Sequence, residues 1–315
     1  MTLRTLGTPD IKVAPLALGG NVFGWTADEV TSFAVLDAFV AAGFNLIDTA
    51  DVYSAWAPGN SGGESESIIG KWLAKTGNRS KVVIATKVGL EMGPGEKGLS
   101  RAYIRRAVER SLNRLRVDTI DLYQAHRDDE ATPLEETLGA FGELIAAGKV
   151  RAIGASNYSA ARLAEALRVS RGKNLPRYVC LQPGYNLYDR AGYEAELEPL
   201  CRAEGIAVIP YYSLAAGFLT GKYRSEADLG KSARGAKVKG YLNDRGAKIL
   251  AALDRVATRY NTTPGKVAIA WLLTRPTVTA PIASATSVAQ LHDLLDATRL
   301  TLEPDAVKEL SDASA

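Results

Sequence analysis

The feature that most constrains the fold is a regular alternation of short apolar runs with amphipathic helical stretches. Apolar residues in the helical stretches recur at i, i+3 and i+4, and the runs between them have the length of buried strands. The eight runs are residues 16–18, 45–47, 82–86, 120–124, 150–154, 179–182, 207–211 and 279–282. Eight strand–helix units in a chain of 315 residues predict an α/β protein with a (β/α)8 TIM barrel.

A doubly wound sheet is the structural rival of the barrel. Such a sheet normally carries a GxGxxG turn after its first strand. The segment ALGGNVFG has glycines at 19, 20 and 24, which is the wrong spacing. No low-complexity linker interrupts the alternation, so residues 1–315 are expected to form one barrel domain. The segments LRTLG and IKVAPLALGG flank a TPD turn and predict an N-terminal β-hairpin.

Local signals place several helix ends. Ser100 is a plausible N-cap for the helix in LSRAYIRRAVERSLNRL, and Pro133 is expected in the first turn of the next helix. Residues 192–205 continue the helical series. Residues 220–246 are glycine-containing and basic, and they predict an extended loop before a helix over 247–260.

Composition excludes several classes of function. The net charge of +3 gives no argument for nucleic acid or an anionic membrane as a partner. Cys180 and Cys201 belong to no metal-binding cluster, so no metal is expected. No secretory signal and no membrane span is visible in the sequence. A cytoplasmic location is therefore expected.

Four polar residues follow consecutive predicted strands, where barrel enzymes carry their active sites. Asp48 ends the second strand and Tyr53 lies in the loop after it, while Lys87 and His126 end the third and fourth strands. Each residue alone has a structural explanation, as a turn former, a solvated lysine or a hydrogen-bonded histidine. Their equivalent barrel positions favour a common site.

The four residues form a coherent set for carbonyl chemistry. A tyrosine hydroxyl keeps its proton at neutral pH and can donate it to a carbonyl oxygen that is becoming an alkoxide. We expect Lys87 to favour release of that proton, Asp48 to hold Lys87, and His126 to orient the carbonyl. A Ser-His-Asp hydrolase fits poorly, because no GxSxG elbow occurs and the chain has two histidines.

These residues stand in motifs that resemble the aldo-keto reductase superfamily, in the branch that includes potassium-channel β-subunits. The motifs follow the family's order along nearly the whole chain: GFNLIDTADVY, ESESIIG, IATKVG, DLYQAHRDD, IGASNY, LQPGYNLYDR, IPYYSLAAGFLTGKY and PIASATSVAQL. The resemblance implies the catalytic tetrad Asp48, Tyr53, Lys87 and His126. It also implies that the N-terminal hairpin closes the bottom of the barrel.

The resemblance further implies a nicotinamide cofactor. Ser156, Asn157 and Gln182 match positions that hold the carboxamide, and Tyr211 matches the aromatic that stacks on the ring. The positions expected around the phosphates and the adenosine are Ser213, Leu214, Gly217, Lys222, Arg234, Ser284, Thr286, Gln290 and Asp293. Many family members carry a lysine and an arginine where Ser284 and Gln290 stand, so we expect NADPH with detectable use of NADH.

Trp25 and Trp56 follow the first two predicted strands. They are candidate walls of an apolar substrate pocket, and packing of the loops against each other is an equal alternative. The expected reaction is reversible NADPH-dependent reduction of an aldehyde or ketone, with a small-molecule carbonyl substrate as the partner. The alternative is a cofactor-sensing accessory protein like the channel β-subunits, because fold alone does not separate these roles.

Overall fold

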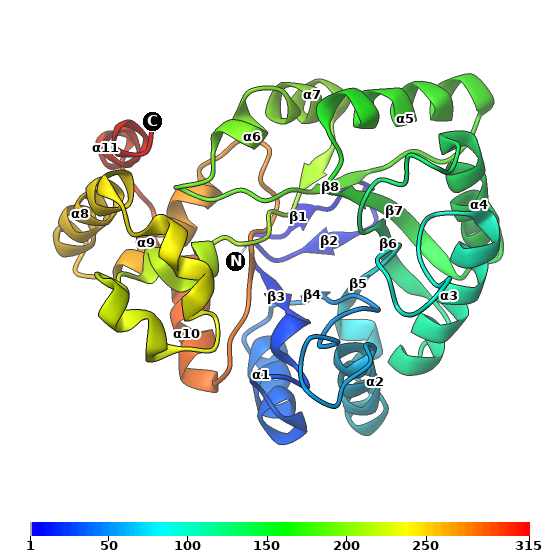
Figure 1. The fold of residues 1–315 in the computed structure, drawn as a ribbon, viewed down its shortest axis with the longest axis horizontal. Helices are drawn as coiled ribbons and strands as arrows, with labels where there is room; N and C mark the ends of the chain where they lie inside the picture. Colours follow the sequence, from blue (N-terminus) through cyan, green and yellow to red (C-terminus); the bar gives the residue numbers. More distant parts are fainter. Residues whose placement is uncertain (1) are drawn as a thin grey trace.

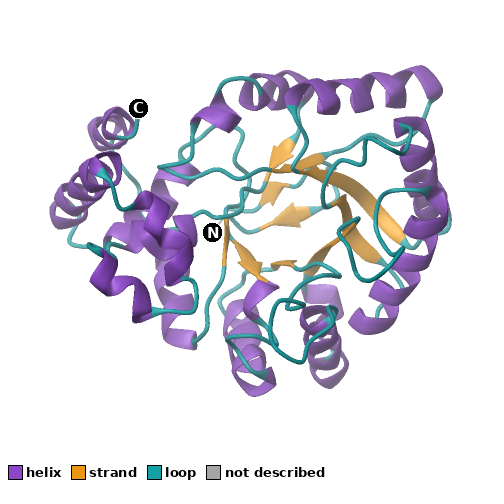
Figure 2. Ribbon diagram, viewed as in Figure 1, coloured by secondary structure: helices purple, strands orange, loops and turns teal. Residues whose placement is uncertain are grey.

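The computed structural model describes residues 2–315 and shows a parallel barrel surrounded by helices (Figure 1). The eight strands pair in the order β10-β3-β4-β5-β6-β7-β8-β9. The ring closes where the backbone N–H groups of Thr279 and Ile282 donate to the carbonyls of Val208 and Pro210. The predicted (β/α)8 barrel is thus confirmed, with the strands inside and the helices outside (Figure 2).

The barrel strands are short and lie near their predicted places. They are β3 (Ala17–Gly19), β4 (Leu46–Asp48), β5 (Val83–Val88), β6 (Ile120–Ala125), β7 (Val150–Ser156), β8 (Cys180–Gln182), β9 (Ala207–Val208) and β10 (Ile282–Ala283). The outer helices are α1 (Glu29–Ala41), α2 (Glu64–Thr76), α3 (Arg101–Leu115), α4 (Leu134–Ala146), α5 (Ala160–Lys173), α6 (Ala191–Glu194), α7 (Leu197–Glu204), α8 (Asp244–Arg259), α9 (Pro264–Leu273), α10 (Val288–Ala297) and α11 (Pro304–Ala313).

The predicted N-terminal hairpin consists of β1 (Arg4–Thr5) and β2 (Lys12–Val13), which pair antiparallel. Its apolar side chains pack with the inward-facing side chains of the barrel. The Arg4 guanidinium donates to the carbonyls of Val278 and Thr279, which precede β10. The hairpin therefore covers the end of the barrel where the strands begin, and the opposite end stays available for a site.

Alternation along the strands builds the barrel interior in layers. Leu46, Ala85, Leu122 and Cys180 belong to one apolar cluster inside the barrel. Successive side chains of a strand point to opposite faces, so residues two positions further along also point inward. These next residues are polar, and they form the floor of the candidate site. A larger cluster between strands and helices contains Trp72 and Trp271, both fully buried as expected of core residues.

Three local predictions need correction. The helix expected over 192–205 is divided into α6 and α7, because the ring of Pro199 would clash with the carbonyl of Ala195 in a continuous helix. Pro133 is the N-cap of α4 and not a first-turn residue. Helix α8 begins at Asp244 and not at residue 247, and the Asn243 side chain caps it. Gly246 lies inside the helix, where a Cβ atom would lie 1.9 Å from the Tyr241 carbonyl oxygen. This glycine therefore serves close packing and does not mark the end of the loop.

Residues 221–243, called the long loop below, are more ordered than predicted. They follow the 3₁₀ helix η3 (Ala215–Thr220) and contain two further 3₁₀ helices, η4 (Glu226–Lys231) and η5 (Gly235–Tyr241). Two other 3₁₀ segments, η1 (Gly20–Val22) and η2 (Asn78–Lys81), lie elsewhere in the chain. None of the helices formed by residues 2–315 is long and apolar enough to cross a membrane.

Candidate active site

Three of the four predicted catalytic side chains form one hydrogen-bonded cluster. The Lys87 ammonium donates to Asp48 Oδ2 at 2.7 Å, to the Thr49 carbonyl at 2.7 Å and to the Tyr53 hydroxyl at 2.9 Å. An ammonium has three protons, so every donor of Lys87 is used. Lys87 and Asp48 are buried, at 0% and 1% exposure. The cluster is a buried ion pair with a phenol attached to it.

The barrel geometry explains why these groups meet. Asp48 lies two residues after Leu46 on β4, and Lys87 lies two residues after Ala85 on β5, so both point inward above the apolar layer. Strands β4 and β5 are neighbours, and Asp48 pairs with Ala85 in their register. The Tyr53 hydroxyl reaches back from the following loop and lies 3.5 Å from Asp48 Oδ2.

Two glutamine side chains hold the other oxygen of Asp48. Gln182 Nε2 donates to Asp48 Oδ1 at 2.8 Å and to Gln124 Oε1 at 3.2 Å, and Gln124 Nε2 lies 3.4 Å from the same carboxylate oxygen. Gln182 was expected at the cofactor, whereas Gln124 was not singled out by the sequence. Its position two residues after the inward-facing Leu122 is the signal that would have found it.

His126 lies beside the phenol, with its ring centroid 6.0 Å from that of Tyr53. Burial first, and then the charges of Lys87 and Arg127, lower the pKa of His126 well below its ordinary value. The imidazole is therefore neutral at physiological pH and keeps one N–H donor. Its Nδ1 atom is buried and has no hydrogen-bond partner within the described chain. A neutral donor at this place suits the orientation of a carbonyl oxygen.

Tyr53 is held as the protonated phenol. Burial and then the Asp48 charge raise the pKa of Tyr53 well above its ordinary value. Burial also lowers the pKa of Lys87, and the Asp48 carboxylate opposes this effect. In the sequence interpretation Lys87 was expected to favour release of the phenolic proton. Lys87 does donate a hydrogen bond to the hydroxyl, but burial and Asp48 dominate.

A second buried acid, Asp51, lies between Asp48 and Tyr53 in the sequence. Asp51 is 2% exposed, and its Oδ1 accepts from the Val52 N–H at 2.7 Å, whereas its Oδ2 has no partner in residues 2–315. Burial and the neighbouring charge of Glu66 raise the pKa of Asp51 to about 8. Asp51 is thus a neutral carboxylic acid below that pH. Sequence reasoning missed it because its state depends on the packing of α2.

The two tryptophans predicted at the substrate pocket do lie together beside the acid. The rings of Trp25 and Trp56 meet edge to face with centroids 5.7 Å apart, and Trp56 lies 6.0 Å from Tyr53. Trp56 is 49% exposed. The rings form an aromatic wall that runs from Tyr53 to the mouth of the barrel. The two tryptophans pack against each other, and Trp56 also leaves an apolar face exposed, so features of both sequence interpretations are present.

The residues expected around a nicotinamide also converge. Ser156 ends β7 and donates to the Gln182 carbonyl at 2.8 Å. Asn157 has a left-handed backbone with φ 57°. Its side chain donates to the His126 carbonyl and accepts from the Tyr211 hydroxyl at 2.7 Å. Residues from β6, β7 and the end of β9 are thereby joined across the rim of the barrel.

The turn after β9 has a left-handed backbone next to a lysine. Ala215, Ala216 and Gly217 all have positive φ, at 48°, 56° and 99°. Two N–H groups of this turn are already used within it, because Ala215 donates to the Tyr212 carbonyl and Gly217 donates to the Leu214 carbonyl. A Cβ atom on Gly217 would lie 3.6 Å from the Lys222 ammonium, so bare backbone and a cation stand side by side. Leu214 caps this turn, but the Ser213 hydroxyl is turned inward and donates to the Pro210 carbonyl.

The residues expected at the adenosine end fall into three contacts. The Ser284 hydroxyl donates to Asn21 Oδ1 at 2.6 Å. The Gln290 side chain accepts from both the backbone and the hydroxyl of Thr286, and Asp293 pairs with Lys266 at 3.0 Å. Ser284, Thr286 and Gln290 present neutral groups only. Lys266 is the cation near this end, and it is engaged by carboxylates.

Arg234, expected at the cofactor phosphates, packs on the aromatic wall. Its guanidinium carbon lies 5.7 Å from the ring centroid of Trp25. Its Nη2 atom is buried and has no partner within residues 2–315.

The residues expected around the cofactor lie along one part of the barrel rim. Ser156 and Gln182 end β7 and β8. After β9 come the Tyr211 ring, whose hydroxyl is held by Asn157, and the turn that brings Lys222 next to Gly217. Within residues 2–315, no group of three or more His, Cys, Asp or Glu side chains is arranged to hold a metal ion.

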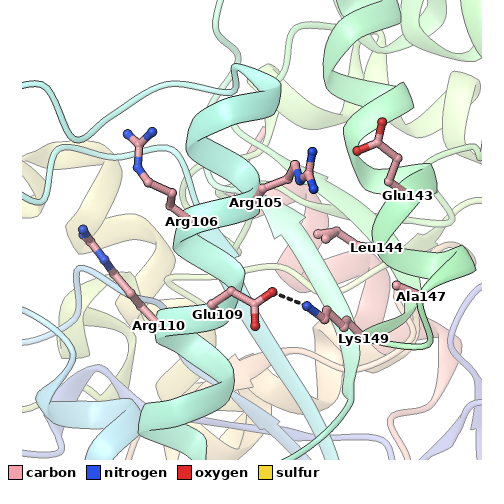
Figure 3. Close-up of a pocket in the computed structure, with 8 residues that line it drawn as sticks. All are labelled: Arg105, Arg106, Glu109, Arg110, Glu143, Leu144, Ala147 and Lys149. Carbon is pink, nitrogen blue, oxygen red and sulfur yellow. Dashed lines mark hydrogen bonds and ion pairs between the residues drawn. The ribbon is translucent and has the colours of Figure 1, made fainter.

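Another concave region lies on the outside of the barrel, between α3 and α4 (Figure 3). Three arginines of α3 project around it, and Glu109 pairs with Lys149 across it. Its charged side chains are exposed, and Glu109 and Lys149 retain 50% and 38% exposure. This groove lacks the buried, coupled groups that characterise the cluster at the strand ends, so it is not a candidate active site.

The fold and the site define a barrel protein with a buried Asp-Lys-Tyr cluster beside a neutral histidine. The model of the Aldo/keto reductase family matches residues 15–315, and the chain belongs to that family. The uncharacterized oxidoreductase YrpG of Bacillus subtilis is 35% identical over 319 residues, covering 99% of this chain and 95% of that protein.

Two further relatives differ in their named roles. The aldo-keto reductase yakc of Schizosaccharomyces pombe, whose name specifies NADP(+), is 31% identical over 93% of this chain and 84% of its own length. A probable voltage-gated potassium channel subunit beta of Oryza sativa subsp. japonica is 32% identical over 98% of this chain and 95% of that protein. Two of these three relatives are thus named as an oxidoreductase or a reductase, and the third as a channel subunit.

Proposed function

We propose that this protein catalyses the reversible NADPH-dependent reduction of an aldehyde or ketone to an alcohol. The observation that carries the proposal is the buried contact of the Tyr53 hydroxyl with Lys87 at 2.9 Å. A phenol held protonated at the mouth of a barrel is a general acid for a carbonyl oxygen. The oxidoreductase names of its relatives support the same class of reaction.

Each side chain has a distinct part in the proposed reaction. Ser156, Asn157, Gln182, Tyr211 and the Gly217–Lys222 turn would hold the nicotinamide cofactor, which would supply hydride for the carbonyl carbon. Tyr53 donates its proton to the carbonyl oxygen. His126 orients that oxygen through its N–H group. Lys87 stabilises the phenolate that Tyr53 leaves, and Asp48 holds the ammonium in place.

Steady-state oxidation of NADPH with a panel of aldehydes tests the proposal. Tyr53→Phe should lower kcat by ~10²–10⁴-fold, because only the general acid is removed. Binding of NADPH should be nearly unchanged, since the hydroxyl acts in the transition state. Tyr260→Phe is the matched control, because that hydroxyl accepts from the Glu303 N–H outside the site. Retention of more than half of the wild-type kcat by Tyr53→Phe would reject Tyr53 as the acid.

The same measurements address the alternative role named for the rice relative. A purified protein that binds NADPH tightly but reduces none of the aldehydes at a measurable rate would favour a cofactor-sensing accessory subunit. Steady turnover that depends on Tyr53 would favour the enzyme.

A further inference from the structure

Three polar side chains from alternate strands fill one layer of the barrel interior. Asp48 lies on β4, Gln124 on β6 and Gln182 on β8, and their exposed fractions are 1%, 0% and 2%. Bulky branched residues dominate such layers in barrels of this kind. A carboxylate and two amides are costly in this place unless their polar atoms are matched. How they are matched to one another therefore decides what the layer can do.

The hydrogen bonds of this layer fix the direction of the Gln182 amide. Asp48 is paired with the Lys87 ammonium, and a carboxylate only accepts hydrogen bonds. The Gln182 atom at 2.8 Å from Asp48 Oδ1 is therefore Nε2, and its second proton goes to Gln124 Oε1 at 3.2 Å. An amide nitrogen has two protons, so both are used inside the layer. Gln182 has only its carbonyl oxygen left to offer to a ligand.

A glycine on β7 gives Gln124 the room to reach Gln182. Strand β7 lies between β6 and β8, and Gly154 pairs with Gln124 on one side and with Cys180 on the other. A Cβ atom on Gly154 would lie 3.1 Å from Gln124 Cγ, which is closer than an ordinary contact. The Gln124 side chain thus crosses β7 over a residue without a side chain. Because Gln124 Nε2 also lies 3.4 Å from Asp48 Oδ1, Gln124 braces both other members of the layer.

Gln182 connects this layer with the residues expected around the nicotinamide. Its backbone carbonyl accepts from the Ser156 hydroxyl at 2.8 Å, and the Tyr211 N–H donates to the carbonyl of the next residue, Pro183, at 2.9 Å. The two ends of a planar amide diverge, so the Gln182 side-chain oxygen is directed away from Asp48 and Gln124. A nicotinamide carboxamide carries an NH2 donor that such an oxygen can accept from.

We infer that Gln124 is a positioning residue of the proposed reaction, which holds the Gln182 amide so that its carbonyl oxygen accepts from the NH2 group of the nicotinamide carboxamide. This inference rests on the proposed carbonyl reduction. Gln124 acts only through Gln182. A fixed acceptor fixes the rotation of the nicotinamide ring, and with it the face of the ring that meets the substrate.

Two cofactors that differ in one group test the inference. NADP+ and its 3-acetylpyridine analogue, in which a methyl group replaces the carboxamide NH2, are titrated by quenching of tryptophan fluorescence. The wild type should bind NADP+ more tightly than the analogue. Gln124→Met keeps the length of the side chain but removes both polar atoms. The ratio of the two dissociation constants should therefore shrink by about twofold to tenfold, as expected for one lost hydrogen bond.

Turnover gives a second measurement on the same variant. In reduction of an aldehyde with NADPH, Gln124→Met should lower kcat, because the nicotinamide is held less well. The KM for the aldehyde should stay near the wild-type value, since Gln124 contacts Asp48 and Gln182 and not the mouth of the barrel. Asn113→Leu removes an exposed amide on α3 and is the control, which should change neither the ratio nor kcat.

Gln124→Glu separates positioning from filling of the barrel. While the introduced carboxyl group is protonated, its C=O can accept from Gln182 and its O–H can donate to Asp48, as the amide does. Burial and the adjoining Asp48 carboxylate raise the pKa of that group, because Lys87 is bonded to the other Asp48 oxygen. The ratio should be that of the wild type at about pH 6 and fall as the pH rises, while the wild-type ratio stays constant.

An unchanged ratio in Gln124→Met would overturn the inference, also where both cofactors bind equally more weakly, because Gln124 would then only fill the barrel. If Gln124→Met shows no cooperative unfolding in urea, Gln124→Glu carries the test alone, and a ratio that does not vary with pH overturns the inference.

The outcomes also distinguish the inference from the proposed function. A wild type that reduces aldehydes with NADPH but binds NADP+ and the analogue equally would overturn the inference and leave carbonyl reduction in place. A wild type that binds neither cofactor and oxidises no NADPH would reject both.

Discussion

Replacing Asp51 by asparagine should stabilise the protein, and the gain should grow as the pH rises. The pKa of Asp51 in the folded chain is about 8, against an ordinary 3.8, because of burial and the charge of Glu66. A raised folded pKa contributes stability that is fully present below 3.8 and is lost as the pH rises through about 8. The difference between these two pKa values corresponds to ~6 kcal/mol in the free energy of unfolding, at about 1.36 kcal/mol for each pKa unit.

Asparagine suits the site because it reproduces the neutral acid. Its Oδ1 can keep the hydrogen bond from the Val52 N–H, and its amide takes the place of an Oδ2 atom that has no partner among residues 2–315. No hydrogen bond of the folded state is lost. The gain of Asp51→Asn over wild type is therefore expected to be small in acid, to increase through neutrality and to level off above pH ~8.

Urea unfolding of both proteins over a range of pH measures this gain as a shift of the midpoint. Asp118→Asn is the matched control, because that aspartate is exposed in the loop before β6 and should give the same shift at every pH. A difference between wild type and Asp51→Asn that stays constant with pH would refute the reasoning, since Asp51 would then not titrate between acid and mild alkali.

Two further predictions follow from the site. Lys87→Met should lower the free energy of unfolding by about 3–5 kcal/mol and suppress turnover. The substitution removes the counter-charge of Asp48 and the donor to the Thr49 carbonyl. An unchanged urea midpoint would contradict this prediction. NADPH should bind more tightly than NADH, but by a modest factor, because Ser284 and Gln290 offer only neutral hydrogen bonds to a 2′-phosphate; equal dissociation constants by fluorescence quenching would contradict it.

The barrel and the core of the site were predictable because they follow from periodicity. Strand ends fix the height of a residue in a barrel, and alternation fixes its face, so Asp48 and Lys87 could be placed together from the sequence. Ser100 as the N-cap of α3 was likewise a local signal, and its side chain does accept from the Tyr103 N–H. Gln124 obeys the same alternation, and the rule applied to every strand would have found it.

The remaining features depend on contacts that no local pattern encodes. The state of Asp51 depends on burial and on Glu66 of α2. Arg234 meets Trp25 only because the long loop folds back across the mouth to the first barrel loop. Ser284 contacts Asn21 because β10 pairs with β3, although the two strands lie at opposite ends of the sequence. In each case the partners are distant in sequence, and their meeting is set by the packed fold.

The closed bottom of the barrel constrains how the proposed acid can regain its proton. Lys87 and Asp48 are buried above an apolar layer, and the N-terminal hairpin covers that layer from below. All three ammonium protons of Lys87 are already engaged by Asp48, Thr49 and Tyr53. Water therefore has no route to the cluster from beneath. The Tyr53 side chain is partly exposed at the mouth, so the proposed acid would regain its proton from that side.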